Sequence, residues 1–220
     1  MEWFLIILIA AAIMYWKMGP GSDNAKAVKR LTNGKTEEQK KTIEYFCREG
    51  CGAKTISDDE YVAMVRSKLD KMNLKERALS QIGLDEDEVN EIPPVVFEGW
   101  VYKNAYAKKT AKGDWVSSSY QVSWIFFGSA EIYLYSYTFN MDDDNKREVT
   151  NEYFYRDVTS FNTISETDKA HGINGETFDV STDQLAMVVP GDKFYLSMVN
   201  SKDAASSIQA MKQKLREKKQ

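Results

Sequence analysis

The chain has 220 residues, of which 43% are hydrophobic and 28% charged, and this balance is typical of one or two globular domains rather than of a disordered polypeptide. Its net charge of -4 argues against a dedicated nucleic-acid-binding protein, which is normally basic. Its two cysteines, Cys47 and Cys51, are too few for a disulfide scaffold.

Residues 3–16 form an uncharged apolar run that carries aromatic residues at both ends. Such aromatic belts are typical of membrane spans, although this run is shorter than the about 20 residues of an untilted crossing. The flanks fit poorly with a cleaved signal peptide, which needs a basic leading segment and a small-residue cleavage site. We therefore expect a transmembrane anchor at residues 1–18, with a cleaved signal peptide or a core helix as alternatives. Its anchoring side chains are Trp3, Phe4, Leu5, Tyr15 and Trp16.

The charges around this run indicate its orientation. No Lys or Arg precedes it, whereas Lys17, Lys26 and further basic residues follow it. By the positive-inside rule, we expect a single-pass protein of the cell membrane with the bulk of the chain in the cytoplasm. Residues 19–35 begin with a Gly-Pro-Gly breaker and are expected to form a juxtamembrane linker, either solvated or in weak contact with anionic headgroups.

A helical segment is predicted for residues 36–92. Capping boxes, in which a capping side chain precedes Glu or Gln by three positions, begin at Thr36, Ser57 and Asn73. Apolar residues recur at helical spacing after each of them, as expected for helices with one buried face. A proline pair at 93–94 ends the segment, because the residue before a proline is biased away from the helical conformation.

Residues 120–164 contain aromatic-rich runs with alternating side chains, separated by short polar breaks, and this pattern predicts antiparallel strands joined by tight turns. The second run has bulk on both faces, so we expect a central strand that is covered on both sides. One face of the first two runs holds Tyr120, Val122, Trp124, Phe126, Tyr133, Tyr135, Tyr137 and Phe139. We interpret the row from Tyr133 to Phe139 as packed core, with a ligand- or base-stacking face as the alternative.

Further strands are expected at 95–102, 177–180, 184–189 and 193–199. Between the central stretch and residue 177, we expect a polar loop that contains the single histidine, His171. The chain closes with an amphipathic helix from about residue 201, whose apolar face is formed by Ala204, Ile208, Met211 and Leu215.

This order of strands with one C-terminal helix resembles the pleckstrin-homology-like (PH-like) fold. Residues 152–161 are similar to a Tyr-x-Asp-Ile-x-Ser-Ile segment of bacterial PH-like domains, and residues 194–200 are similar to their last strand and helix start. The resemblance implies an α+β fold in which residues 95–220 form an antiparallel β-barrel or sandwich capped by the C-terminal helix.

Two looser resemblances point to bacterial membrane proteins. Residues 54–69 resemble the short helical SHOCT-type modules attached to many such proteins, which implies a small interaction hairpin. The whole chain is similar to uncharacterised bacterial membrane-anchored proteins in which a run like residues 84–89 (LDEDEV) precedes a Trp- and Tyr-rich sheet. Neither resemblance supplies an activity.

No motif indicates catalysis or a cofactor, because the chain has no nucleophile elbow, Walker motif or dinucleotide-binding glycine pattern. We therefore expect neither an enzyme nor a bound cofactor or metal. We interpret His171 as a solvated loop residue rather than a catalytic base. Cys47 and Cys51 have the spacing of one helix face, but a structural zinc site needs four ligands. We interpret them as two structural residues near a helix end, with a metal site or a pair of redox-active thiols as the alternatives.

The acidic run Asp142-Asp143-Asp144 is interpreted as a polar turn. An EF-hand loop that starts at Asp142 would need Gly and Glu where the chain has Arg147 and Tyr153. Asp and Asn stabilise turns because their side chains bond nearby main-chain groups.

We expect a non-enzymatic, membrane-tethered binding or scaffold protein whose PH-like domain recognises a protein or peptide partner, and no nucleic acid. PH-like folds bind phosphoinositides through basic residues of their first hairpin loops, so anionic lipid headgroups are an alternative ligand. The candidate binding residues are Lys103, Lys108, Lys109 and Lys112. A second alternative is an extracytoplasmic envelope domain on a signal anchor. Function is expected at the loops 103–114, 141–147 and 166–175.

Overall fold

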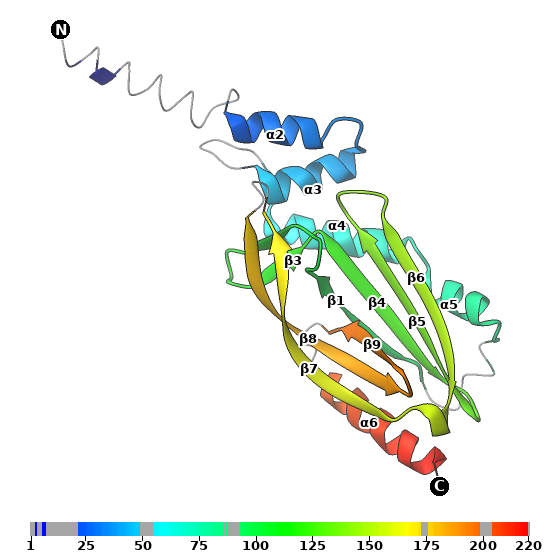
Figure 1. The fold of residues 1–220 in the computed structure, drawn as a ribbon. Coiled ribbons are helices and arrows are strands. Elements are labelled where there is room, and N and C mark those ends of the chain that lie inside the picture. The colour runs from blue at the N-terminus through cyan, green and yellow to red at the C-terminus, as the bar shows by residue number, and fades with distance from the viewer. Residues whose placement is uncertain are drawn as a thin grey trace.

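The structure, a computed structural model, describes residues 3, 6–7, 22–48, 55–85, 87, 93–172, 176–198 and 204–219. Antiparallel sheets form its centre, and helices lie on the outside (Figure 1). The helices are α2 (Asp23–Leu31), α3 (Glu37–Cys47), α4 (Asp58–Asp70), α5 (Leu74–Ile82) and α6 (Ala204–Lys218), with a 3-10 turn, η2, at Tyr155–Asp157. The strands are β1 (Val95–Val101), β2 (Ala107–Lys109), β3 (Trp115–Ser117), β4 (Ser119–Phe127), β5 (Glu131–Asn140), β6 (Lys146–Phe154), β7 (Ser160–His171), β8 (Thr177–Val189) and β9 (Asp192–Ser197).

The strands form three antiparallel sheets. The largest has the order β1-β4-β5-β6, the second has the order β7-β8-β9, and the hairpin β2-β3 is inserted between β1 and β4. The predicted α+β class, the antiparallel sheets and the C-terminal helix are confirmed. The prediction of a closed barrel is wrong, because within the described ranges no ladder of main-chain hydrogen bonds joins the four-stranded sheet to the three-stranded sheet.

The two larger sheets meet at the end of β9, where side-chain contacts replace a main-chain ladder. The main-chain N–H of Ser197 donates a hydrogen bond to Gln121 Oε1 at 2.7 Å, and its hydroxyl donates to the carbonyl of Trp100 at 3.3 Å. Gly99 permits this close approach, because a Cβ at that position would lie 3.1 Å from the carbonyl carbon of Met198. The sheets therefore join at one corner and remain separate layers of a sandwich.

Strand β5 is covered on both faces, as its bulky side chains predict. Tyr135 is fully buried on one face and packs in a cluster with α3, α4 and α5. Leu134, on the other face, packs in a second cluster with the three-stranded sheet and α6. The helix residues of the first cluster are Tyr45, Tyr61, Val65, Leu74, Ala78 and Leu79. The aromatic row is therefore packed core, as we interpreted it.

Helices α3 and α4 begin at the predicted capping boxes. The hydroxyls of Thr36 and Ser57 accept hydrogen bonds from main-chain N–H groups three positions later, and the side chains of Gln39 and Glu60 accept from the capping residues in return. The prediction of a third capping box, at Asn73, is wrong. Asn73 has a φ of 46° and makes no side-chain cap, because it adopts the left-handed conformation that turns the chain between α4 and α5.

Helix α2 lies within the stretch expected to be a linker, and the sequence did not predict it. Ser22 caps this helix by accepting a 3.2 Å hydrogen bond from the N–H of Ala25. Val28, the buried residue of α2, packs against Ile43 and Cys47 of α3. One buried side chain is too weak a periodic signal to identify a helix from sequence.

The polar stretch after residue 164 is strand rather than loop, which corrects the prediction. β7 continues to His171, and β8 pairs with it along its whole length. The two short strands predicted at 177–180 and 184–189 are both part of β8. The middle of this hairpin is polar and largely exposed, so it lacks the apolar alternation by which half-buried strands are recognised.

The C-terminal helix is predicted correctly. Ile208, Met211 and Leu215 of α6 are buried in the cluster that also contains the inner faces of both larger sheets. Figure 1 shows α6 lying along the side of the sandwich opposite the other helices. The side chain of Ala204, the first residue of its predicted face, lies outside the described side chains.

The predicted membrane anchor lies largely outside the described residues, and so do its residues Phe4, Leu5, Tyr15 and Trp16. The described residues of the anchor, Trp3, Ile6 and Ile7, are helical and exposed. Among the helices that the structure describes, none is both long and apolar enough to cross a membrane.

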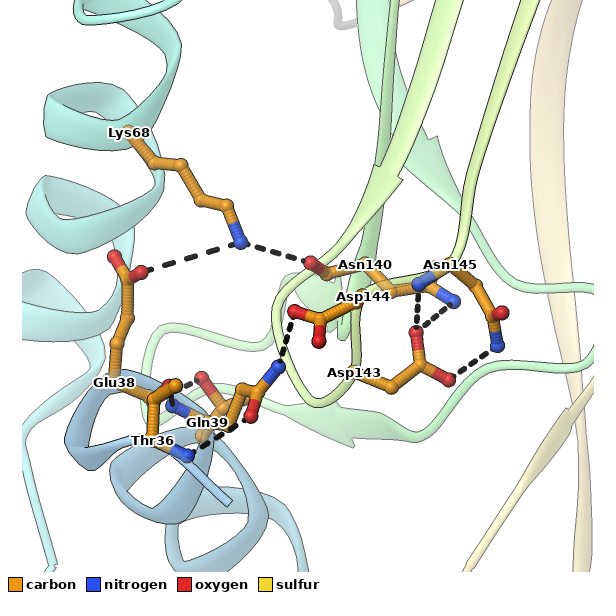
Figure 2. A network of polar contacts seen from close by, with 9 residues as sticks. Thr36, Glu38, Gln39, Lys68, Asn140, Asp143, Asp144 and Asn145 are labelled. Atoms are coloured by element: carbon orange, nitrogen blue, oxygen red, sulfur yellow. Dashed lines mark hydrogen bonds and ion pairs between the residues drawn. The ribbon is translucent and has the colours of Figure 1, made fainter.

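Polar contacts fix the helical layer to the turn between β5 and β6, as Figure 2 shows. Gln39 closes the capping box of α3 through Oε1 and donates from Nε2 to Asp144 Oδ1 at 2.8 Å. Lys68 of α4 donates to the carbonyl of Asn140 at 3.0 Å and lies 4.0 Å from Glu38 Oε2. Both helices are thus attached to one turn of the sheet.

Replacing Tyr61 by Phe tests how α4 is attached to the sheet. Tyr61 is fully buried, and its hydroxyl donates a 2.6 Å hydrogen bond to the carbonyl of Ser117. Without this donor we expect the free energy of unfolding to fall by about 1–2 kcal/mol. Urea unfolding followed by circular dichroism measures the change. Tyr195→Phe, at an exposed position of β9, is the matched control; an equal loss in both variants would contradict the attachment.

Candidate functional site

A groove lies where α4, the β2-β3 hairpin, β1 and β8 come together. It consists of two adjoining hollows of about 470 and 290 Å³, and both have Trp100, Asp114 and Trp115 in their walls. The first hollow continues to Tyr102 and Asp183. The second continues along α4 and the hairpin to a tyrosine of β4. We term the two hollows together the tryptophan groove.

The two tryptophans of the groove are held from several elements. Trp100 of β1 stacks on Tyr61 of α4 with ring centroids 6.0 Å apart. Trp115 of β3 accepts a 3.0 Å hydrogen bond from the Tyr102 hydroxyl at its carbonyl, and its ring lies 6.0 Å from that of Phe178 on β8. Because these partners come from distant parts of the chain, the groove forms only when the helices and both larger sheets are assembled.

Asp58 attaches the hairpin to the helices at one end of the groove. Its carboxylate accepts hydrogen bonds from the Tyr45 hydroxyl at 2.6 Å and from the N–H of Ala111 at 2.8 Å. These two hydrogen bonds, the tyrosine first, hold the pKa of Asp58 below its ordinary value. Burial and the same carboxylate raise the pKa of Tyr45. Asp58 is therefore a structural anion, ionised at neutral pH.

The four predicted lysines have different surroundings. Lys108 Nζ lies 4.2 Å above the ring of Tyr45, and Lys112 Nζ lies 3.2 Å from Asp59 Oδ1. Lys103 and Lys109 are exposed. Only Lys112 lines the groove, and a carboxylate already accompanies it.

The three aspartates of the acidic turn have three different roles. Asp143 closes the turn by accepting hydrogen bonds from the main chain and side chain of Asn145, and Asp144 binds Gln39 of α3. Asp142 is half-buried, and its buried Oδ1 makes no hydrogen bond within the described part of the chain. Burial is the main reason why the pKa of Asp142 is raised. The acidic run forms a polar turn, as we interpreted it. The different contacts of the three aspartates could not be predicted from the sequence, because the run is uniform.

Neither His171 nor Cys47 lines the groove. His171 is the last residue of β7 rather than part of a loop, and its main-chain N–H donates to the carbonyl of Ala105 at 2.9 Å. Cys47 is fully buried at the end of α3, in the cluster with α2. Cys51 lies outside the described residues, so our interpretation of the two cysteines as structural residues stays a prediction.

The residues that sequence reasoning missed are Trp100, Trp115 and Asp183. The two tryptophans flank a loop that was expected to be functional, and their position around a basic, glycine-containing turn is the signal that could have identified them. Asp183 has no such signal, because β8 brings it to the groove through pairing over a long sequence separation.

The buried carboxylate of Asp142 predicts a pH dependence of stability. Between the ordinary carboxyl pKa of 3.8 and the raised value in the folded protein, the folded state binds more protons than the unfolded state. Stability therefore falls as the pH rises through this window. Asp142→Asn removes this loss. We therefore expect the free energy of unfolding of the variant, minus that of the native protein, to be higher at pH 7 than at pH 4. Urea unfolding at both pH values measures it.

Asp192→Asn, at an exposed site on β9, is the control for the loss of one carboxylate. The same pH dependence in this control, or a relative stability of Asp142→Asn that does not change between pH 4 and pH 7, would show that burial of Asp142 has no energetic effect.

Comparison of the chain with known protein families, with curated proteins and with solved structures gives no match. No residue of the tryptophan groove therefore takes a role from a relative. What the groove can do has to be argued from its shape, its side chains and its charges.

Proposed function

We propose that the chain is a non-enzymatic, membrane-tethered binding or scaffold protein that recognises a protein or peptide partner in the tryptophan groove. The observation that carries this proposal is the pair of hollows around Trp100 and Trp115. Both tryptophans are partly exposed. Tryptophans in preformed hollows are typical anchors of protein interfaces, because they bury a large area at a small cost in conformational entropy.

A PH-like layout for residues 95–220 is part of the proposal. A four-stranded sheet, a three-stranded sheet and one C-terminal helix follow one another along the chain, which supports this layout. The β2-β3 hairpin and the layer of α3, α4 and α5 would be additions to it. The SHOCT-like stretch largely corresponds to α4, whose packing on the sheet places it in one wall of the groove.

The surroundings of the lysines favour a polypeptide partner over an anionic lipid headgroup. Lys112 is paired with Asp59, and Lys108 lies over an aromatic ring. A phosphate would have to compete with these contacts and approach the carboxylates of Asp58 and Asp114. Repulsion between like charges makes this the less favourable ligand.

Site-specific crosslinking in the full-length protein tests the groove. A photoreactive phenylalanine analogue replaces Trp115 in one variant and Tyr195, an exposed residue of β9, in a control, and membranes from cells that express each variant are irradiated. We expect a discrete protein adduct from position 115 and none from position 195. Trp100→Ala should reduce the adduct about fivefold, because loss of an interface anchor typically costs more than 1 kcal/mol.

Circular dichroism and thermal unfolding establish that each crosslinking variant is folded. Adducts of equal yield from positions 115 and 195 would contradict the proposal, as would the absence of any protein adduct at position 115 in a folded variant.

We also propose that residues 1–18 attach the protein to the cell membrane and that the remainder lies in the cytoplasm. The exposed helical residues Trp3, Ile6 and Ile7 and the uncharged run around them support the attachment. The basic residues that follow the run support the orientation. An extracytoplasmic envelope domain is the competing orientation.

Deletion and labelling test this topology. Removing residues 1–18 should move the protein from the alkali-washed membrane pellet to the soluble fraction. With Tyr195→Cys in a Cys51→Ser background, a membrane-impermeant maleimide should label the protein only after lysis, because Cys47 is buried and Tyr195 is exposed. Labelling in intact cells would show that the body lies outside the cytoplasm. A deleted protein that stays in the pellet would refute the anchor.

A further inference from the structure

The tryptophan groove has an excess of negative charge. Its walls contain the carboxylates of Asp58, Asp59, Asp114 and Asp183 and the cations of Arg66 and Lys112. Both cations already have carboxylate partners, because Arg66 lies 2.7 Å from Glu98 and Lys112 lies 3.2 Å from Asp59. The positive charges of the wall are therefore compensated before a ligand arrives.

Two carboxylates of the groove have no cationic partner. Within the described ranges, neither Asp114 nor Asp183 forms an ion pair with Lys or Arg. Asp183 accepts a 2.5 Å hydrogen bond from the hydroxyl of Ser165, which orients its carboxylate. Burial raises the pKa of Tyr102, and the negative charges of Asp168 and Asp114 raise it further. The wall of the first hollow thus contains two carboxylates that no cation of the described residues pairs with.

The aromatic side of the larger sheet already attracts cations within the chain. Arg66 lies 5.6 Å from the ring centre of Tyr120, Lys68 lies 5.6 Å from that of Phe139, and Arg77 lies 5.4 Å from that of Tyr137. In the part of the chain that the structure describes, no cation lies over Trp100 or Trp115. Tryptophan is the ring that attracts a cation most strongly.

We infer that the tryptophan groove binds a basic segment of a partner polypeptide, with an arginine guanidinium stacked on Trp100 or Trp115 and paired with Asp114 and Asp183. The inference rests on the proposed function and adds the chemistry of the partner. Arginine fits better than lysine, because its planar group stacks on aromatic rings and binds a carboxylate through two parallel hydrogen bonds. An acidic segment would meet repulsion from the groove.

Titration with synthetic peptides tests the inference on the full-length protein in detergent micelles. The probe is a fluorescein-labelled peptide of repeated Gly-Ser-Arg, and its control has citrulline in place of Arg, which keeps the shape and removes the charge. We expect the arginine peptide to bind about tenfold more tightly in fluorescence anisotropy, and its affinity to weaken as salt is raised. Equal affinity for the two peptides overturns the inference, as does tighter binding of a Gly-Ser-Glu peptide.

Matched charge variants locate the binding. Asp114→Asn combined with Asp183→Asn should weaken binding of the arginine peptide about fivefold, while asparagine can still accept the hydrogen bond from Ser165. The control combines Asp157→Asn with Asp192→Asn, which removes the same charge at two residues that do not line the groove. Unchanged affinity in the groove variant overturns the inference, and so does an equal loss in both variants.

The crosslinking result separates this inference from the proposed function. A protein adduct at position 115, together with no preference for arginine over citrulline, overturns only the basic partner. The absence of both an adduct and peptide binding in folded protein overturns the proposed function as well.

Discussion

The burial of β5 on both faces is the constraint on which the rest of the structure depends. A strand with large side chains on both sides has to be covered on both, since either face would otherwise leave aromatic surface in water. The helices α3, α4 and α5 cover one face, and the three-stranded sheet with α6 covers the other. The helices that precede the sheet are therefore as integral to the fold as the helix that follows it.

The groove is a consequence of how these covering layers end. Trp100 belongs to the aromatic surface that α4 covers, because it stacks on Tyr61, but it also reaches the border between α4 and the β2-β3 hairpin. Contacts that stabilise the fold, such as the bond of Ser197 to Gln121, also set the walls of the groove. A site of this kind is preorganised, and a ligand that enters it does not have to order its walls.

Elements with a strong local pattern could be predicted from the sequence, and elements that depend on distant partners could not. Alternating aromatics identified β4 and β5, and capping boxes located the starts of α3 and α4. The polar middle of the β7-β8 hairpin and the single buried residue of α2 gave no comparable pattern. The same distinction holds for the residues of the groove. Lys112 and Asp114 lie in a loop that was expected to be functional, whereas Asp183 reaches the groove only through the pairing of β8.

The order of the layers along the chain has a consequence for biosynthesis. The helices α3, α4 and α5 leave the ribosome before the strands whose aromatic face they cover. Tyr45, Tyr61 and Val65 have no sheet to pack on until β4, β5 and β6 have emerged and paired, and Gln39 has no acceptor until Asp144 is made. The nascent helical half therefore exposes apolar surface until the sheet has been synthesised, and such exposed surface favours aggregation.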